Sequence, residues 1–324
     1  MYVKAVYSVG EEMSDRELVR KKFLGSLLGA ALGDAIGASW EGHPMAAEQE
    51  IRHLLRISHT LRYTDDTHMS IGVAESLVEN GGFNGKHMAQ RFADNYFRQP
   101  WRGYGPGPPR VFRLLKTGTA WDKAASRIYP GGSFGNGAAM RAAPIGLFFW
   151  NKPARLKEVA YQASLITHSH PLGMEGAAIQ AMAVALAVAE NPDESLGSGS
   201  FISRLFDFVT EDVYRAKIAK LSTLLKRHTD RQTVVAELGH GIEAFNSVPT
   251  AIFAFLAHAR DFVSAIIYAI SLGGDTDTIA SMAGAISGAY LGIEAIPQEW
   301  LEQLENRDYI LNLADRLWQA ASGQ

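Results

Sequence analysis

Glycines spaced four residues apart constrain the fold of this chain more than any other feature. They recur in two apolar stretches, at Gly25, Gly29, Gly33 and Gly37 and again at Gly284, Gly288 and Gly292. Residues four apart share one face of an α-helix, so each set predicts a helix with a glycine stripe along one side. A glycine costs about 1 kcal/mol relative to alanine inside a helix, which favours a stripe only where another backbone packs closely. We expect the two helices to be central and to pack against each other.

Two clusters of Asp and Thr precede helical patterns. One is Asp275, Thr276, Asp277 and Thr278, directly after Gly273-Gly274, and the other is Thr64-Asp65-Asp66-Thr67. For one such cluster alone, helix capping is the commoner explanation, because a helix start has free N–H groups and the positive end of the helix dipole. The second cluster changes that balance.

A third acid, Glu41, closes the first glycine helix. If the two glycine helices pack together, Glu41 comes near Asp275 and Asp277. Hard divalent cations prefer oxygen ligands, and so many carboxylates in one cleft would repel one another without a cation. The sequence therefore predicts a metal-binding acidic cluster.

The composition excludes several classes of protein. The 324 residues carry 31 Lys and Arg against 34 Asp and Glu, so the basic surplus typical of nucleic-acid binding is absent. There is no cysteine, which excludes disulfides, zinc-thiolate sites and cysteine nucleophiles. Residues 1–22 lack the apolar core of a signal peptide, and we expect a cytoplasmic protein without membrane spans.

The coarse pattern is helical throughout. After a capping box at Ser14-Asp15-Arg16-Glu17, helical periodicity is expected over residues 23–37, 69–79, 86–98, 111–115, 156–165, 173–189, 201–209, 214–226, 234–244, 250–259, 262–271 and 279–293. The alternation of a half-buried strand is missing. We therefore predict an all-α fold in which residues 1–22 lead into one domain, residues 23–324.

Three further features have two interpretations each. The loop at residues 131–137 offers unobstructed backbone N–H groups that suit a phosphate, although an ordinary helix connection is the commoner explanation. His168 and His170 suit an anion, a metal or a solvated helix start. Arg102 and Arg141 suit bidentate pairing with phosphate, although most arginines are simply solvated.

Taken in their order along the chain, these motifs resemble those of a known family. Gly29 to Gly37 with Glu41, the Thr64 and Asp275 clusters, and the loop Gly132-Ser133-Phe134-Gly135-Asn136-Gly137 are similar to those of the ADP-ribosylglycohydrolases. The resemblance spans residues 23–318. Residues 102–105, Thr167-His168 and residues 247–252 resemble most the subgroup that cleaves serine-linked ADP-ribose, poly(ADP-ribose) and O-acetyl-ADP-ribose. The chain departs from that subgroup at Ile128, where the subgroup has phenylalanine, and Tyr129 stands next to it.

The resemblance implies an all-helical, single-domain orthogonal bundle with two Mg²⁺ ions, or Mn²⁺ in their place. One ion would be held by Thr64, Asp65, Asp66 and Asp277, and the other by Glu41, Asp275, Asp277 and Thr278. Substrate would contact Asp65, Gly131, Gly132, Ser133, Phe134, Gly135, Asn136, Gly137, His168 and Ile242. The implied partners are ADP-ribosylated proteins, ADP-ribose and O-acetyl-ADP-ribose, bound by a monomer.

The expected reaction is cleavage at the anomeric carbon of ribose, through an oxocarbenium-like state. Glu41 is the first candidate for proton transfer, with Asp65 and Asp66 as alternatives. Two other functions remain open from the sequence: hydrolysis of arginine-linked ADP-ribose, and a catalytically silent ADP-ribose-binding or structural protein. The complete set of acids argues against the silent protein.

Overall fold

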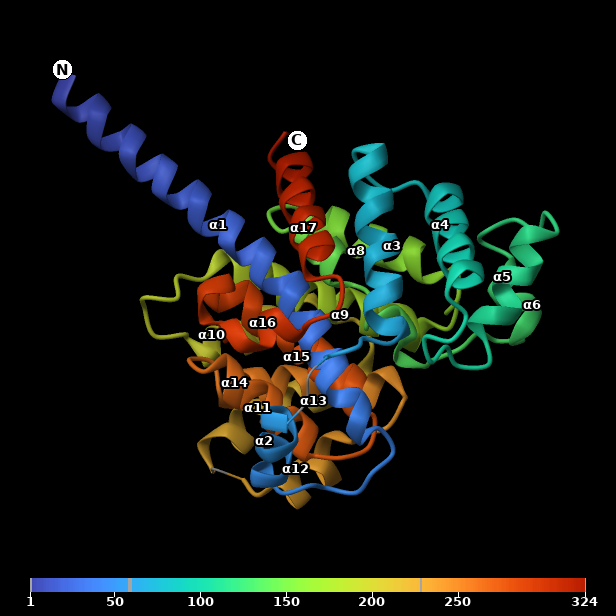
Figure 1. Cartoon of the computed structure of the whole chain (residues 1–324). Coiled ribbons are helices and arrows are strands. Elements are labelled where there is room, and N and C mark those ends of the chain that lie inside the picture. The colour runs from blue at the N-terminus through green and yellow to red at the C-terminus, as the bar shows by residue number, and fades with distance from the viewer. Residues whose placement is uncertain (1, 58–59, 228, 324) are drawn as a thin grey trace.

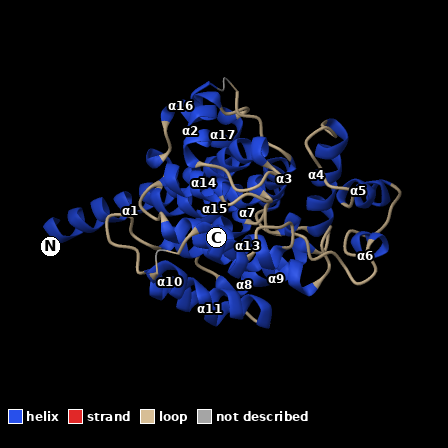
Figure 2. Cartoon of the chain, turned by 90° about the horizontal axis from the view of Figure 1, so that it is seen from below, coloured by secondary structure: helices blue, strands red, loops and turns tan. Residues whose placement is uncertain are grey.

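The structure, a computed structural model, describes residues 2–57, 60–227 and 229–323, with side chains from Asp15 onward. The described residues form helices and loops without a β-strand, and their only β-type pairings are two isolated bridges (Figure 2). The predicted all-α class is confirmed.

The helices follow one another with short connections. In chain order they are α1 (Tyr2–Gly37), α2 (Glu48–Ile57), α3 (Asp65–Asn80), α4 (Gly85–Arg98), α5 (Pro108–Lys116), α6 (Ala124–Ile128), α7 (Ala143–Phe148), α8 (Pro153–Ser164), α9 (Pro171–Ala189), α10 (Ser198–Phe208), α11 (Asp212–Lys226), α12 (Arg231–Leu238), α13 (Ala244–Ala257), α14 (Phe262–Ser271), α15 (Thr276–Leu291), α16 (Gln298–Gln303) and α17 (Arg307–Ser322). The described residues also form the short 3-10 helices η1 (Ala38–Trp40), η2 (Asn136–Ala138) and η3 (Ile293–Ala295).

The two glycine helices, α1 and α15, pack antiparallel through the middle of the molecule (Figure 1). A Cβ placed on Gly25 would lie 2.5 Å from the carbonyl oxygen of Gly288, and one placed on Gly29 would collide with the backbone of Gly284. At the other end, a Cβ on Gly37 would lie 2.6 Å from the Cα of Asp277. The predicted pairing is confirmed, and its register brings the end of α1 to the start of α15.

Several predicted boundaries need correction. The start of the first helix at Ser14 was wrong, because α1 already runs from Tyr2 and continues through residue 22. The domain boundary placed at that residue stays a prediction. The helix expected over residues 234–244 ends at Leu238, because Gly239 has a φ of 83° that breaks it. The helix expected over residues 111–115 already starts at Pro108, because proline in the first turn of α5 needs no N–H partner.

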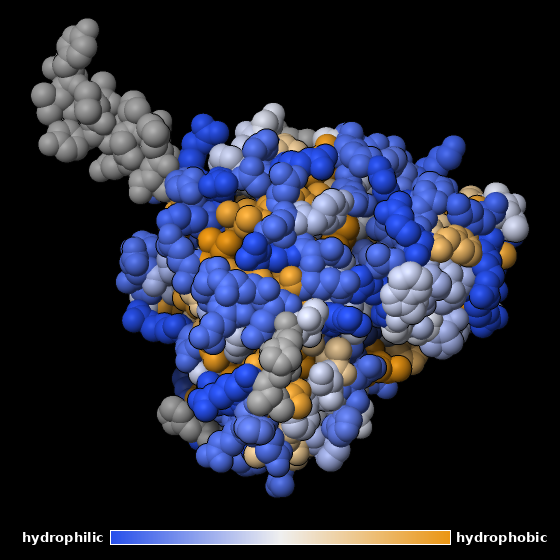
Figure 3. Space-filling view, viewed as in Figure 1, coloured by the Kyte–Doolittle hydropathy of each residue, from blue (hydrophilic) through white to orange (hydrophobic). Residues whose placement is uncertain are grey.

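The sequence pattern also missed short or amphipathic helices, namely α6, α7, α16 and α17. In the part of the chain that the structure describes, residues 15–40 and α9 are long and apolar enough to cross a membrane, and 83% of each apolar window is buried inside the fold. Such burial is what core helices require. Hydrophilic residues cover much of the surface seen in Figure 3, with apolar residues in smaller patches.

Candidate active site

A cavity of about 270 Å³ opens where α1 ends and α15 begins. Acids line one part of it: Glu41, Asp65, Asp66, Asp275 and Asp277, with Thr278 beside them. Glycine-rich loops and His168 line the rest. The cavity thus has an anionic part, which suits a cation, and a part lined by glycine backbone with accessible N–H groups, which suits a phosphate-bearing ligand.

Glu41 is held in place by its backbone neighbours. It follows η1, and the N–H of Gly42 donates to the carbonyl oxygen of Gly274 at 2.9 Å, while the N–H of Gly274 donates to that of His43 at 3.1 Å. Gly273 and Gly274 have φ values of 72° and 76°, a left-handed conformation that only glycine adopts readily. Through these hydrogen bonds, the Gly-Gly pair fixes the Glu41 segment next to the start of α15.

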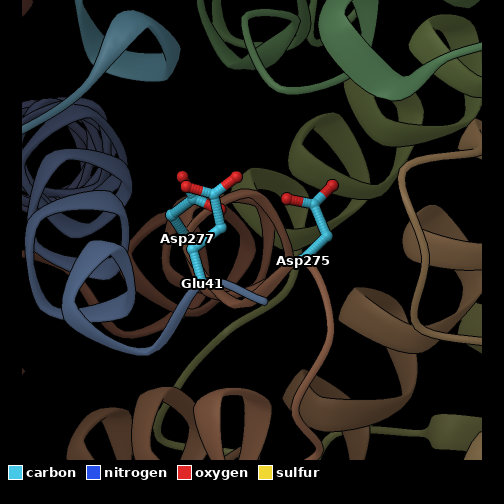
Figure 4. A group of neighbouring side chains, drawn as sticks. All are labelled: Glu41, Asp275 and Asp277. Atoms are coloured by element: carbon cyan, nitrogen blue, oxygen red, sulfur yellow. The ribbon is translucent and has the colours of Figure 1, made fainter. Parts of the chain in front are cut away.

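The three acids Glu41, Asp275 and Asp277 form a tight group. One carboxylate oxygen from each lies within 4.8 Å of the others. Figure 4 shows their carboxylates directed toward the same side of the helix start. Asp275 also accepts a hydrogen bond from the side-chain amide of Asn136, and Asp277 accepts one from the N–H of Thr278 at 2.9 Å. This group could hold a metal ion.

Two more acids come from the start of α3. Asp66 is only 2% exposed, and its Oδ2 atom has no hydrogen-bond partner among the described residues. Burial raises the pKa of Asp65 to about 7 and that of Asp277 to about 10, and the neighbouring carboxylates add to both shifts. Burial also raises the pKa of Asp66 well above its ordinary value, and Asp34 and Asp277 add to that shift. An orphaned carboxylate oxygen within such repulsion fits a site built for a cation.

Asp34 is a site residue that the sequence reasoning missed. It is fully buried on α1 and accepts hydrogen bonds from the N–H and hydroxyl groups of Thr64 and Thr67, at 2.6–3.0 Å. Burial raises the pKa of Asp34, and these donors oppose the rise. Asp34 thereby ties the Thr-Asp-Asp-Thr segment to the glycine helix. A lone Asp in an apolar helix interior is the signal that could have identified it, because buried carboxylates need partners.

The glycine loop and the segment before α13 pair with each other. The N–H of Asn136 donates to the carbonyl oxygen of Ile242 at 2.9 Å, and the N–H of Ala244 donates to that of Phe134 at 3.0 Å. Ile242 is 66% exposed and Phe134 is 45% exposed. The pairing fixes two exposed apolar side chains near the cavity, where a flat apolar group can contact them.

The predicted substrate residues fall into two groups. Those lining the cavity are Asp65, Ser133, Gly135, Asn136, Gly137, His168 and Ile242. The lining does not include Gly131, Gly132 and Phe134, which lie in the same loop. The predicted metal ligand Thr64 is also absent from the lining, and its hydroxyl donates to Asp34. Tyr129 also lines the cavity, and its ring packs against Gly107.

Neither arginine considered for phosphate pairing presents its guanidinium to the cavity. Arg102 forms a bidentate ion pair with Glu305 at 2.7 and 2.9 Å. Arg141 is 1% exposed and donates to backbone carbonyls and to Thr167. Both guanidinium groups donate their hydrogen bonds to partners within the protein, so the prediction of bidentate phosphate pairing was wrong for both arginines.

Comparisons with known proteins agree with this site. A profile of the ADP-ribosylglycohydrolase family matches residues 15–324. The protein named ADP-ribosylhydrolase ARH3 from Xenopus tropicalis is 38% identical over 318 residues, which are 86% of this chain and 89% of that protein. The Homo sapiens protein of the same name is 34% identical over 336 residues, which are 91% of this chain and 92% of that protein.

A solved structure supports the same assignment. A chain described as an ADP-ribosylglycohydrolase-related protein complex superimposes with a TM-score of 0.72 and 26% identity, covering 94% of this chain and 99% of that chain. The chain therefore belongs to the ADP-ribosylglycohydrolase family, whose members are hydrolases that act on glycosidic bonds of ADP-ribose.

Proposed function

We propose that this protein is a Mg²⁺-dependent hydrolase that releases ADP-ribose from serine-linked ADP-ribose, poly(ADP-ribose) or O-acetyl-ADP-ribose. The observation that carries the proposal is the close group of Glu41, Asp275 and Asp277 beside a glycine-rich loop in one cavity. The similarity to proteins named ADP-ribosylhydrolase ARH3 supports hydrolysis of an ADP-ribosyl bond.

The donor set fits a hard divalent cation. All the candidate ligands are oxygen atoms, and the unpartnered Oδ2 of Asp66 is a free ligand position. Glu41, Asp275, Asp277 and Thr278 would hold one Mg²⁺, and Thr64, Asp65, Asp66 and Asp277 another, with Mn²⁺ as the alternative ion. When bound, the cations would orient the ribose hydroxyls and polarise the departing group.

Glu41 is our candidate for proton transfer. Its side chain is exposed at the cavity wall, and its backbone segment is clasped to Gly274. Partial burial raises the pKa of Glu41, and the charges of Asp275 and Asp34 add to the shift. A carboxyl group with a raised pKa holds or releases a proton more readily near neutral pH, which is what protonation of a departing oxygen requires.

The opposite part of the cavity suits the rest of ADP-ribose. Backbone N–H groups of the loop at residues 131–137 would take the diphosphate, and the side chain of His168 lies against Gly137. Tyr129, Phe134 and Ile242 offer apolar surface to adenine. Tyr129 stands beside the position where the subgroup has phenylalanine, and its ring lines the cavity.

The metal-free protein is expected to lose stability as pH rises from about 4 toward about 7. A raised carboxyl pKa, as for Asp65, means that the folded state binds more protons than the unfolded state in this window, so stability falls with pH. Mg²⁺ binds the ionised form, so the gain in melting temperature on adding it should grow over the same window. Melting curves in EDTA and in Mg²⁺ measure both trends. Asp65→Asn should flatten the metal-free decline, and an unchanged slope in that variant would contradict the prediction.

Replacing Asp34 with asparagine is expected to weaken Mg²⁺ binding by about 10–100-fold, the usual cost of losing a partner that orients metal ligands. An amide has one acceptor oxygen and cannot hold both Thr64 and Thr67 as the carboxylate does. Calorimetric titration with Mg²⁺ measures the effect. Asp261→Asn is the matched control, because that carboxylate also accepts from a backbone N–H and a hydroxyl, at an exposed helix start. Equal Mg²⁺ affinities in the wild type, Asp34→Asn and Asp261→Asn would contradict a role of Asp34 in orienting the metal ligands.

The substrate is tested by incubating the protein with serine-linked, arginine-linked and O-acetyl ADP-ribose substrates. Release of ADP-ribose from the serine and O-acetyl substrates supports the proposal. Release from the arginine-linked substrate alone would assign the protein to the other activity of the family. Binding of ADP-ribose without release from any of the three would identify a silent binder.

A further inference from the structure

Arg141 is a buried cation that donates hydrogen bonds to neutral carbonyl and hydroxyl oxygens. It is 1% exposed, and none of the ion pairs in the described part of the chain includes it. Its guanidinium lies 4.7 Å from the ring centre of Phe92 and donates to the carbonyl oxygens of Gly137 at 2.9 Å and Ala163 at 3.3 Å. A further N–H donates to the hydroxyl oxygen of Thr167 at 2.7 Å. Burying a guanidinium costs free energy, which suggests that Arg141 has a functional role in addition to packing.

The hydrogen bonds around Thr167 determine where its proton points. A guanidinium only donates, so the Thr167 hydroxyl oxygen accepts from Arg141. The same oxygen lies 2.7 Å from Nδ1 of His168, and Thr167 is 3% exposed. The hydroxyl proton therefore goes to Nδ1, because donation from Nδ1 would leave the buried hydroxyl proton without an acceptor. It follows that Nδ1 of His168 accepts and that Nε2 carries the ring proton.

The Nε2 end of His168 faces the glycine loop. A Cβ placed on Gly137 would lie 2.7 Å from Cε1 of His168, and one placed on Gly135 would lie 3.5 Å from Nε2. His168 lines the cavity together with both glycines. Burial lowers the pKa of His168 to about 3, and the charge of Arg141 adds to the shift, so the ring stays neutral.

We propose that Arg141 is a positioning residue that acts through Thr167 to hold His168 as a neutral Nε2–H donor toward the diphosphate of bound ADP-ribose. The diphosphate rests on the proposed function; the hydrogen-bond chain does not. The same guanidinium holds the carbonyl oxygen of Gly137, so one buried cation fixes both the histidine and the end of the loop. The arrangement favours ligand groups that only accept hydrogen bonds, as phosphate oxygens do.

The first test is the tautomer of His168 in the ligand-free protein. Nitrogen-15 NMR of the histidine rings distinguishes a protonated from an unprotonated ring nitrogen, and the signals of His168 are those that disappear in His168→Gln. We expect Nε2 protonated and Nδ1 unprotonated in the wild type. We expect a mixture of tautomers in Thr167→Val, with the wild-type pattern restored in Thr167→Ser. A protonated Nδ1 in the wild type overturns the proposal, even if Thr167→Val does not fold.

The role of Arg141 needs its own variant. Arg141→Met removes the donor to Thr167, so the hydroxyl is free either to donate to Nδ1 of His168 or to accept from it. We expect the tautomer mixture of Thr167→Val in this variant. A pure Nε2–H tautomer in folded Arg141→Met would show that Arg141 does not set it.

The second test compares ligands with and without the diphosphate. By calorimetry in Mg²⁺, Thr167→Val should bind ADP-ribose about tenfold more weakly than the wild type, the effect of one lost hydrogen bond to a charged group. Its affinity for adenosine should be unchanged, and Thr167→Ser should recover most of the loss. An equal loss for both ligands, or no loss for either, overturns the role toward the diphosphate. If wild-type protein binds no ADP-ribose, the proposed function fails and the role toward the diphosphate fails with it, whereas the NMR result still decides the tautomer.

Discussion

Glu41→Gln is expected to lower turnover by about 10²–10⁴-fold, the usual contribution of proton transfer by a positioned side chain. Glutamine keeps the size of the side chain and one oxygen atom, but it cannot transfer the proton. The backbone hydrogen bonds of Gly42 and Gly274 hold the segment independently of this side chain, so the cavity should keep its shape. ADP-ribose affinity should therefore change far less than turnover. A turnover assay beside calorimetry with ADP-ribose and Mg²⁺ separates the two effects.

The control is Glu50→Gln, an exposed acid on α2 that is absent from the cavity lining and should keep full activity. Full turnover in Glu41→Gln would remove Glu41 from the proton path and leave Asp65 or Asp66 as the candidate. Loss of ADP-ribose binding together with turnover would give Glu41 a mainly metal-holding role.

Gly288→Leu is expected to destabilise the protein by about 3 kcal/mol or more, because overpacking where two backbones meet cannot be relieved by side-chain movement. Even the first carbon of the new side chain would collide with the carbonyl group of Gly25 and approach the N–H nitrogen of Ser26 to 2.9 Å. Both obstacles are backbone atoms of α1, which is itself packed in the core. Denaturant unfolding, or the fraction of folded protein at the growth temperature, measures the effect.

Gly199→Leu is the matched control for this substitution. Gly199 also lies in a helix, α10, but a Cβ placed there would meet nothing within 4 Å. We expect its stability to change by less than about 0.5 kcal/mol, or to rise, because glycine is a poor helix former. Equal stabilities of the Gly288 and Gly199 variants would contradict the close approach of α1 and α15.

The glycine spacing allowed the centre of the fold to be predicted from the sequence. Four-residue periodicity is a local signal, and only close backbone contact explains a stripe of it, so the α1–α15 pair followed directly. That pair then predicted the meeting of Glu41 with Asp275 and Asp277, because the acids sit at the adjoining helix ends. Helices such as α6 and α7 were missed because five or six residues are too few to show a period.

Residues that act through buried polar contacts could not be placed in advance. Asp34 shows no partner within its own helix, since Thr64 and Thr67 reach it only after the chain returns. Arg141 looked like a phosphate ligand because its chemistry suits one, and only its three-dimensional burial excludes that role. Tertiary contacts decide such cases, because a polar side chain in a sequence carries no sign of whether water or protein will pair with it.

The most direct test of the central claim is turnover of one substrate, serine-linked ADP-ribose, after removal of divalent cations with EDTA and again after their return. We expect release of ADP-ribose to stop in EDTA and to recover when Mg²⁺ is added in excess, with no recovery in Asp277→Asn, because Asp277 lies in the tight acidic group and next to both proposed ion positions. Equal turnover with EDTA and with Mg²⁺ would contradict a metal-dependent reaction at this acidic cluster.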